Sequence, residues 1–153
     1  MIKTDRRVRL CAALLAVNIL FIWGNSLLPG EVSGAISHWV RNVLAFLLPG
    51  GTDSPDTGHG LVRKLAHFTE FACLGALFTW LLSMYRKAAI WALPLGAFVA
   101  SVDETIQRFV PGRGPSVIDV LIDTAGVLLG IGVLLLGYTV RKSQKSKKED
   151  PMK

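Results

Sequence analysis

The sequence has little charge for its length. Of its 153 residues, 18% are charged and 51% are hydrophobic, with a mean hydropathy of +0.45, whereas soluble domains carry about 25% charged residues. Intrinsic disorder is excluded, because disordered chains combine high charge with few apolar residues. The length is typical of a single domain, and the composition indicates that this domain lies in a membrane.

Cysteine is scarce as well. Cys11 and Cys73 both lie in apolar stretches, where cysteines usually behave as small buried hydrophobic residues. They form no CxxC pair and no metal-binding spacing, and the chain has no glycine-rich nucleotide loop. The cysteines therefore say little about the redox compartment.

The 17 basic residues give a net charge of +6, but they are concentrated at the two ends of the chain. A nucleic-acid surface needs a basic stripe on a folded face, with aromatic residues interleaved. Here the basic ends flank long apolar runs, which is a membrane pattern. We therefore expect no nucleic-acid partner, and we expect the basic tail to contact anionic membrane lipids.

Four apolar segments have the about 20 residues that a helix needs to cross a bilayer. The second and third reach this length only if charged positions are counted inside them. The first is interpreted as an uncleaved span, because its apolar stretch is long for a signal peptide and no clear cleavage site follows. The four spans cover about residues 8–28, 61–85, 88–110 and 117–140.

This pattern predicts an all-α fold, a four-transmembrane-helix bundle over residues 8–140. A basic N-terminus, residues 1–7, precedes it, and a basic tail, residues 141–153, follows it. Twelve of the 17 Lys and Arg residues lie at the N-terminus, in the Arg86–Lys87 turn and in the tail. Because cytoplasmic segments carry an excess of Lys and Arg, both termini are predicted to be cytoplasmic.

An extra helix is predicted between the first two spans, at about residues 35–48. Apolar residues such as Ile36, Trp39 and Val43 recur there at helical spacing, and Pro49-Gly50-Gly51 ends the pattern. The segment is too short to span a membrane, so we expect an amphipathic helix in the outer interface. His59 follows in a polar stretch and is expected to be a solvated loop residue.

Ionisable residues inside the predicted spans are the most informative feature, because they are costly in hydrocarbon and usually face a cavity or a partner. In the second span, Lys64, His67 and Glu70 form a stripe along one helix face, with Arg63 near its edge. The ionisable residues concerned, together with the polar Gln107, are Arg63, Lys64, His67 and Glu70 in the second span, Asp103, Glu104 and Gln107 in the third, Arg113 after it, and Asp119 and Asp123 in the fourth.

These residues are predicted to lie at one depth. At 1.5 Å per residue, three spans of alternating direction place them within about 10 Å of the outer boundary. Independent helix ends would not need to coincide, so a single polar site in the outer third of the bilayer is favoured. Two alternatives stay open. The charges form a structural salt-bridge network, or Arg63, Lys64, Arg108 and Arg113 are snorkelling interface anchors.

Two features concern helix packing. Gly126, Gly130 and Gly137 continue the helix face of the fourth-span carboxylates, and small residues let another helix approach closely. Asn25 and Ser26, at the end of the first span, are expected to form interhelical hydrogen bonds at the depth of the polar site.

Three spaced motifs carry a family resemblance. They are Lys64-x-x-His67-Phe68-x-Glu70-Phe71, then Asp103-Glu104-x-x-Gln107-x-Phe109-x-Pro111-Gly112-Arg113, then Ser116-x-x-Asp119-Val120 leading to Gly126-x-x-x-Gly130. Together they resemble the VanZ-like family over about residues 10–140, and the combination is much more specific than any one motif.

The resemblance implies a bacterial plasma-membrane protein with four spans and a role in the cell envelope. The family takes its name from a glycopeptide-resistance accessory protein that lowers susceptibility to teicoplanin, and it implies no agreed reaction. One departure is Asp123, where the resemblance leads us to expect an uncharged Asn in many relatives. The resemblance therefore does not imply an essential carboxylate at this position.

The first hypothesis is an enzyme that acts on an envelope lipid or a lipid-linked precursor. The candidate catalytic residues are His67, Glu70, Asp103 and Glu104, and the candidate substrate-binding residues are Lys64, Gln107, Arg113 and Asp119. His67 and Glu70 are plausible general acid/base partners, and the two basic residues suit a phosphate. Asp103, Glu104 and Asp119 offer the oxygen ligands that Mg²⁺, Mn²⁺ or Ca²⁺ prefers.

The second hypothesis is a non-catalytic protein whose charged cluster binds an anionic lipid headgroup, a lipid-linked cell-wall precursor or the glycopeptide itself. A third, a small carrier or ion pathway, is disfavoured because the inner halves of the spans have few polar residues.

Overall fold

The computed structural model describes residues 2–47, 58–85 and 89–149, and within these ranges the chain is helical and contains no strand. Its helices are α1 (Ile2–Ser26), α2 (Gly30–Leu47), α3 (Gly58–Met84), the short 3-10 helix η1 (Ala89–Trp91), α4 (Ala92–Gln107) and α5 (Val117–Glu149).

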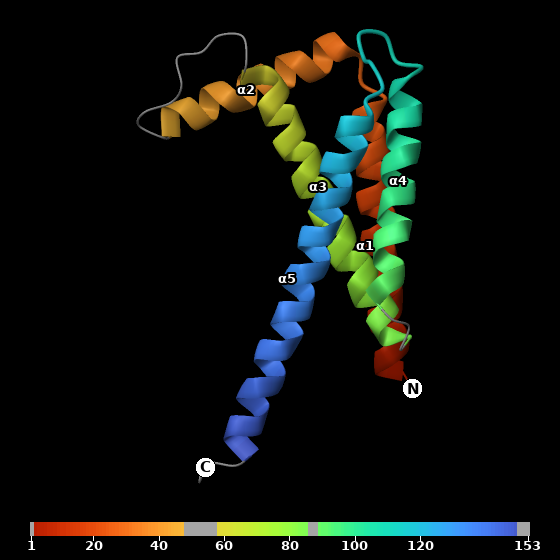
Figure 1. Ribbon diagram of the computed structural model, residues 1–153, viewed down its shortest axis with the longest axis vertical. Helices are drawn as coiled ribbons and strands as arrows, with labels where there is room; N and C mark the ends of the chain where they lie inside the picture. The colour runs from red at the N-terminus through yellow and green to blue at the C-terminus, as the bar shows by residue number, and fades with distance from the viewer. Residues whose placement is uncertain (1, 48–57, 86–88, 150–153) are drawn as a thin grey trace.

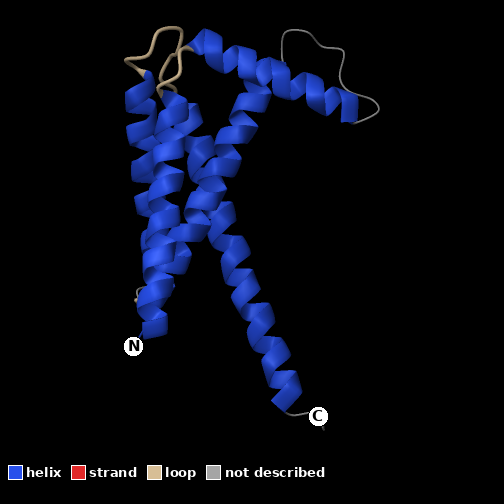
Figure 2. Cartoon of the chain, turned by 180° about the vertical axis from the view of Figure 1, so that it is seen from behind, coloured by secondary structure: helices blue, strands red, loops and turns tan. Residues whose placement is uncertain are grey.

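Four helices form the body of the molecule (Figure 1). α1, α4 and the second half of α3 run side by side, while α5 crosses α3 and then diverges from the others. The view from behind shows the same crossing, with α2 lying across one end of the bundle (Figure 2). The apolar core lies between α1, α3, α4 and α5 and includes Ile22, Phe71, Leu74, Val99 and Val127.

Glycines make the crossing of α3 and α5 possible. A Cβ atom at Gly126 would overlap the backbone oxygen of Phe68, and one at Gly130 would overlap that of Ala72. The predicted glycine-lined approach of another helix is therefore confirmed at these two positions. It is wrong for Gly137, because no described residue lies within 4 Å of the place where its Cβ would be.

Three helices in the described ranges are long and apolar enough to cross a membrane: Arg6–Ser26, Leu61–Met84 and Val117–Lys145. Their outer faces are apolar too. Leu128, Val133 and Leu136 of α5 are 52%, 62% and 65% exposed. Helices that are apolar on all sides belong in a protein core or a membrane.

The helix ends differ in places from the sequence expectation. α4 has 16 residues, fewer than predicted for residues 88–110, because the chain winds more tightly at Arg108–Val110 before the Pro111-Gly112 turn. α2 begins at Gly30 rather than near residue 35. His59, expected in a loop, lies in the first turn of α3. The Pro49-Gly50-Gly51 stop and the Arg86–Lys87 turn lie outside the described residues.

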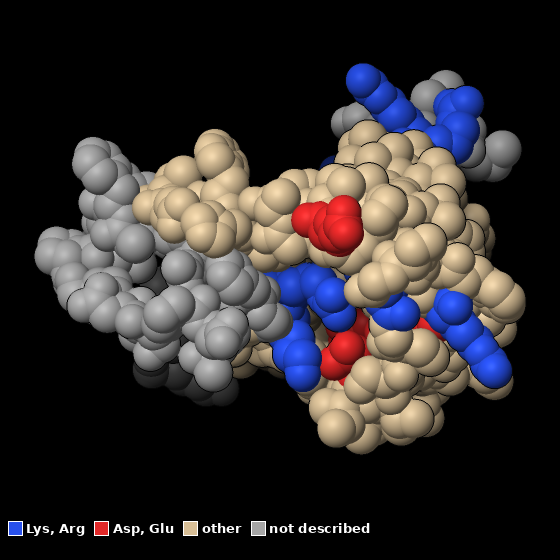
Figure 3. Space-filling view, turned by 90° about the horizontal axis from the view of Figure 1, so that it is seen from above, with Lys and Arg blue, Asp and Glu red and all other residues tan. Residues whose placement is uncertain are grey.

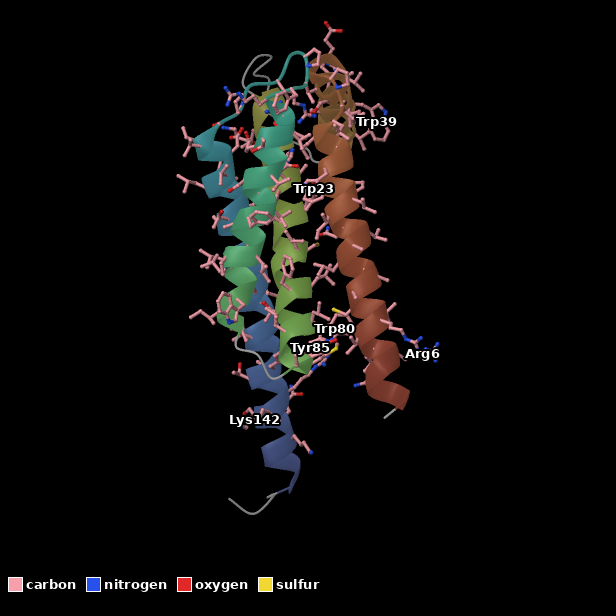
Figure 4. The ribbon with its side chains drawn as sticks, turned by 90° about the vertical axis from the view of Figure 1, so that its right-hand side faces the viewer. Arg6, Trp23, Trp39, Trp80, Tyr85 and Lys142 are labelled. Atoms are coloured by element: carbon pink, nitrogen blue, oxygen red, sulfur yellow. The ribbon has the colours of Figure 1, made fainter. Side chains whose placement is uncertain are left out.

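The two ends of the bundle differ in their side chains (Figure 4). Arg6 and Lys142 lie towards one end, as do Trp80 and Tyr85. The start of α1 and the end of α5 lie at that end as well (Figure 1). Trp39 lies at the opposite end, on α2. The polar residues of the spans gather near the α2 end.

Candidate functional site

One face of α4 is buried along its whole length, but its chemistry changes along the helix. The buried positions recur every three or four residues, which places them on a single face. They are Ala92, Gly96, Val99 and Ala100, followed by Asp103, Glu104 and Gln107. The helix face that packs into the apolar core therefore ends as a buried acidic cluster.

Asp103 lies at the centre of this cluster and is fully buried. Its Oδ2 atom accepts hydrogen bonds from Ser26 Oγ at 2.8 Å and from Gln107 Nε2 at 2.9 Å. Nδ1 of His67 lies 3.8 Å from the same oxygen. Asp103 thus connects α1, α3 and α4, and its Oδ1 atom has no hydrogen-bond partner among the described residues.

Glu104 holds the start of α5. Its Oε2 atom accepts the backbone N–H of Ser116 at 2.7 Å, and Ser116 Oγ accepts the backbone N–H of Asp119 at 3.3 Å. Ser116 is thus the N-cap of α5, and in a capping box the side chain three positions later, here Asp119, would accept the backbone N–H of Ser116. Because Glu104 takes that role, the carboxylate of Asp119 is available to pair with Lys64, 3.5 Å away.

Glu70 is held by the end of α1. Asn25 Nδ2 donates a hydrogen bond of 2.9 Å to Glu70 Oε1, while Oε2 is buried without a partner among the described residues. Together with the bond from Ser26, this contact confirms the prediction that Asn25 and Ser26 form interhelical hydrogen bonds. Ser26 donates to Asp103 rather than to His67, so it is not a nucleophile activated by that histidine.

Arg113 is directed back towards α1 by the preceding turn. Gly112 has a φ of +73°, a conformation that favours glycine. Arg113 then donates from Nε to the carbonyl oxygen of Leu28 at 3.0 Å and from Nη2 to that of Asn25 at 2.9 Å. A cation at a helix C-terminus is favourable, although burial lowers the pKa of Arg113. Arg113 is therefore not a solvent-facing anchor.

Two cavities meet at His67. The smaller has a volume of about 10 Å³, roughly what one water molecule or ion needs, and the larger, about 130 Å³, is a groove between α1, α2 and α3. Arg63 and His67 line both. The smaller is completed by Lys64, Glu104, Gln107, Asp119, Ile122 and Asp123, and the polar lining of the larger includes Asn25, Ser33, Ser37, Glu70 and Arg113. Seen from this end, basic side chains lie around acidic ones (Figure 3).

A comparison with protein families decides where this chain belongs. The family model described as VanZ/LLP1 matches residues 11–138, a range that contains every residue of the site described above. The chain belongs to the VanZ/LLP1 family. No curated protein and no solved structure matches the sequence significantly. Family membership and the apolar helices together identify a membrane protein.

The structure brings the eight candidate residues of this VanZ/LLP1 protein to one end of the bundle. Asp103 and Gln107 are buried in contact with each other, and Glu104 of α4 binds the start of α5, where Asp119 lies. Glu70 and Arg113 bind the end of α1. His67 lies beside Asp103, and Lys64 is the most exposed of the group, with 45% of its side chain accessible. Arg108 is exposed and lines a separate surface pocket with Glu104.

Asp123 is not among the eight candidate residues, but the structure buries it beside them. It is 1% exposed, and its Oδ2 atom has no hydrogen-bond partner among the described residues. Ligand atoms of His67, Asp103 and Asp123 lie within 4.8 Å of one another. The spacing of four residues from Asp119 indicates that Asp123 lies on the helix face of the site. Its departure from the family pattern, in contrast, argues against an essential carboxylate at this position.

Proposed function

We propose that this VanZ/LLP1 protein crosses the bacterial plasma membrane four times, with both termini in the cytoplasm. At 1.5 Å per residue the 16 residues of α4 span about 24 Å, and η1 together with the turn after α4 extends this towards the about 30 Å of the hydrocarbon core. The concentration of Lys and Arg at the chain ends supports this topology.

In this arrangement α2 is an interfacial helix at the outer surface. Trp39 is 67% exposed and lies at the end of the bundle opposite Arg6 and Lys142. Tryptophan is enriched at the level of the lipid headgroups. α2 then covers the larger groove from the outer leaflet, where envelope lipids and lipid-linked precursors carry their headgroups.

The function that this geometry supports best is recognition of the anionic headgroup of an envelope lipid or lipid-linked cell-wall precursor. The observation that carries the proposal is the groove of about 130 Å³ that joins Arg63 and Arg113 to His67 and Glu70. Guanidinium groups suit phosphate oxygens, and a histidine and a carboxylate in the same groove suit proton transfer. By altering or masking such a precursor, the protein would lower susceptibility to glycopeptides such as teicoplanin.

Within this site each contact has a role. Asn25 holds one oxygen of Glu70, which leaves Oε2 to accept a proton from a bound headgroup. His67, beside Asp103, lines the same groove and can hydrogen-bond the bound headgroup. Lys64, paired with Asp119 at the edge of the smaller cavity, adds positive charge beside the bound anion.

The test is teicoplanin susceptibility of a sensitive host that expresses the wild type, Glu70→Gln or Asp103→Asn at matched membrane levels. The matched control is Glu31→Gln, an exposed carboxylate in the first turn of α2. We expect the wild type and the control to raise the inhibitory concentration and the two site variants to lose the effect. Analysis of the lipid precursors then shows whether a headgroup has changed.

Other outcomes separate the alternatives. Equal protection by all variants would make the charged cluster a structural salt-bridge network. A graded loss without an altered precursor would identify a non-catalytic binder of the headgroup or the antibiotic. No protection by the wild type would remove the resistance role.

A further inference from the structure

We infer that His67, Asp103 and Asp123 bind a divalent transition-metal ion, Zn²⁺ or Mn²⁺. Each offers one ligand atom, and the three atoms lie within 4.8 Å of one another in buried positions. The residues come from three helices, α3, α4 and α5, so an ion here would join the elements that cross in the bundle. The site adjoins the groove of the proposed function, because His67 lines both cavities, but it is located by these ligand atoms alone.

The carboxylates provide an observation independent of their clustering. Asp103 and Asp123 are 0% and 1% exposed, and Oδ1 of Asp103 and Oδ2 of Asp123 have no hydrogen-bond partner among the described residues. A buried carboxylate oxygen without a partner is costly, and two buried carboxylates close together repel each other. A bound divalent cation supplies the charge and the contacts that both oxygens lack.

Asp103 is also held as a metal ligand would be. Ser26 and Gln107 both donate to its Oδ2 atom, at 2.8 and 2.9 Å, which fixes the carboxylate and leaves Oδ1 without a protein partner. Carboxylates that bind metals are usually oriented by such hydrogen bonds from outside the coordination sphere.

This ligand set differs from the all-carboxylate set that the sequence suggests. Glu104 is engaged by the backbone N–H of Ser116, and Asp119 is paired with the ammonium group of Lys64. A positive charge already beside Asp119 opposes the approach of a cation. His67, Asp103 and Asp123 therefore form the better site.

The donor atoms indicate the kind of metal. One imidazole nitrogen with two carboxylate oxygens suits Zn²⁺ or Mn²⁺ better than Ca²⁺ or Mg²⁺, which prefer oxygen ligands alone. Metal–ligand bonds of about 2.0–2.2 Å place ligand atoms about 3–4 Å apart, so the side chains close by about 1 Å around the ion. His67 and Asp123 also line the smaller cavity, which gives the ion an open position towards Arg63 and Lys64.

The experiment measures metal binding by the full chain in lipid nanodiscs. The protein is stripped with a chelator and dialysed against Zn²⁺ alone or Mn²⁺ alone, and bound metal is measured by mass spectrometry. We expect about one ion per chain for the wild type and at least a tenfold weaker affinity for His67→Ala and Asp123→Ala. Glu31→Ala is the neutral control, and Asp119→Ala tests the alternative carboxylate set. Both are expected to bind like the wild type.

Folding is checked separately. Because Asp123→Ala removes a buried carboxylate whose Oδ2 atom has no hydrogen-bond partner among the described residues, the variant is expected to fold. Its thermal midpoint should not respond to Zn²⁺, while that of the wild type rises. With Mn²⁺, electron spin-echo spectra should show nitrogen coupling that disappears in His67→Ala.

The inference is overturned if the wild type binds neither ion, if Asp123→Ala binds metal as tightly as the wild type, or if Asp119→Ala alone abolishes binding. Since metal content is measured on the isolated protein, these outcomes leave the susceptibility result standing. Likewise, a failure of the susceptibility test does not affect the metal measurement.

Discussion

The hydroxyl group of Ser26 donates a hydrogen bond of 2.8 Å to Oδ2 of Asp103, a residue 77 positions later in the chain. Both residues are fully buried. The bond joins the last turn of α1 to the polar end of α4, and hydrogen bonds to a charged acceptor in a low-dielectric interior are among the stronger ones. It therefore links the packing of the bundle to the orientation of a candidate site residue.

Ser26→Ala should lower the free energy of unfolding by about 1–3 kcal/mol, because it removes a buried donor to a carboxylate. The measurement is reversible unfolding in mixed micelles. The matched control is Ser101→Ala on α4, an exposed serine whose hydroxyl donates to the carbonyl oxygen of Ala97 in its own helix. Its expected change is within about 0.5 kcal/mol. Equal effects of the two substitutions would contradict the role of the Ser26 bond.

Gly130→Ala should destabilise the crossing of α3 and α5. The added methyl group would overlap the backbone oxygen of Ala72, whereas a Cβ at Gly132 would have nothing within 4 Å in the part of the chain that the structure describes. Overpacking of this kind costs about 1–3 kcal/mol or more, while Gly132→Ala should be neutral or slightly stabilising because alanine favours helix. Thermal denaturation in detergent compares the two, and a Gly130→Ala protein as stable as wild type would rule out the close crossing.

Arg113→Lys should lower stability although it keeps the charge. The guanidinium group reaches two carbonyl oxygens, those of Leu28 and Asn25, whereas an ammonium group lacks that planar fork. Loss of one charge-assisted bond predicts a decrease of about 1.5–3 kcal/mol in the free energy of unfolding. Arg108→Lys, at an exposed position on the same turn, is the control, and equal stability of both variants would refute the argument.

The position of the two termini tests the number of spans. An even number places both termini on one side of the membrane, whereas three spans place them on opposite sides. We expect green fluorescent protein to fluoresce when fused to either end and alkaline phosphatase to be inactive at either end. Fluorescence at only one terminus would leave α4 as a helix that does not cross.

Much of the fold is predictable from local patterns. Apolar runs of about 20 residues predict membrane-spanning helices, and three helices that meet the length and composition requirement lie where such runs occur. Helical periodicity also predicts that Gly126 and Gly130 share a face, and both lie against α3. These features depend on residues close together in the chain, so the sequence contains them directly.

The gathering of the charges is predictable too, because depth along a helix follows from residue number. Asp103, Glu104 and His67 were expected near one level, and the structure brings them to one end of the bundle. The contacts of Asn25 and Ser26 with this group follow the same reasoning.

The tertiary structure alone decided which neighbours each carboxylate of α5 has. Asp119 and Asp123 are one helical turn apart, and helical periodicity places them on the same face. The crossing of α5 over α3 places Asp119 beside Lys64, near the cavity edge, and buries Asp123 next to His67 and Asp103. Pairing depends on the angle and register at which helices distant in sequence meet, and that geometry is set by packing across the whole bundle rather than by any local pattern.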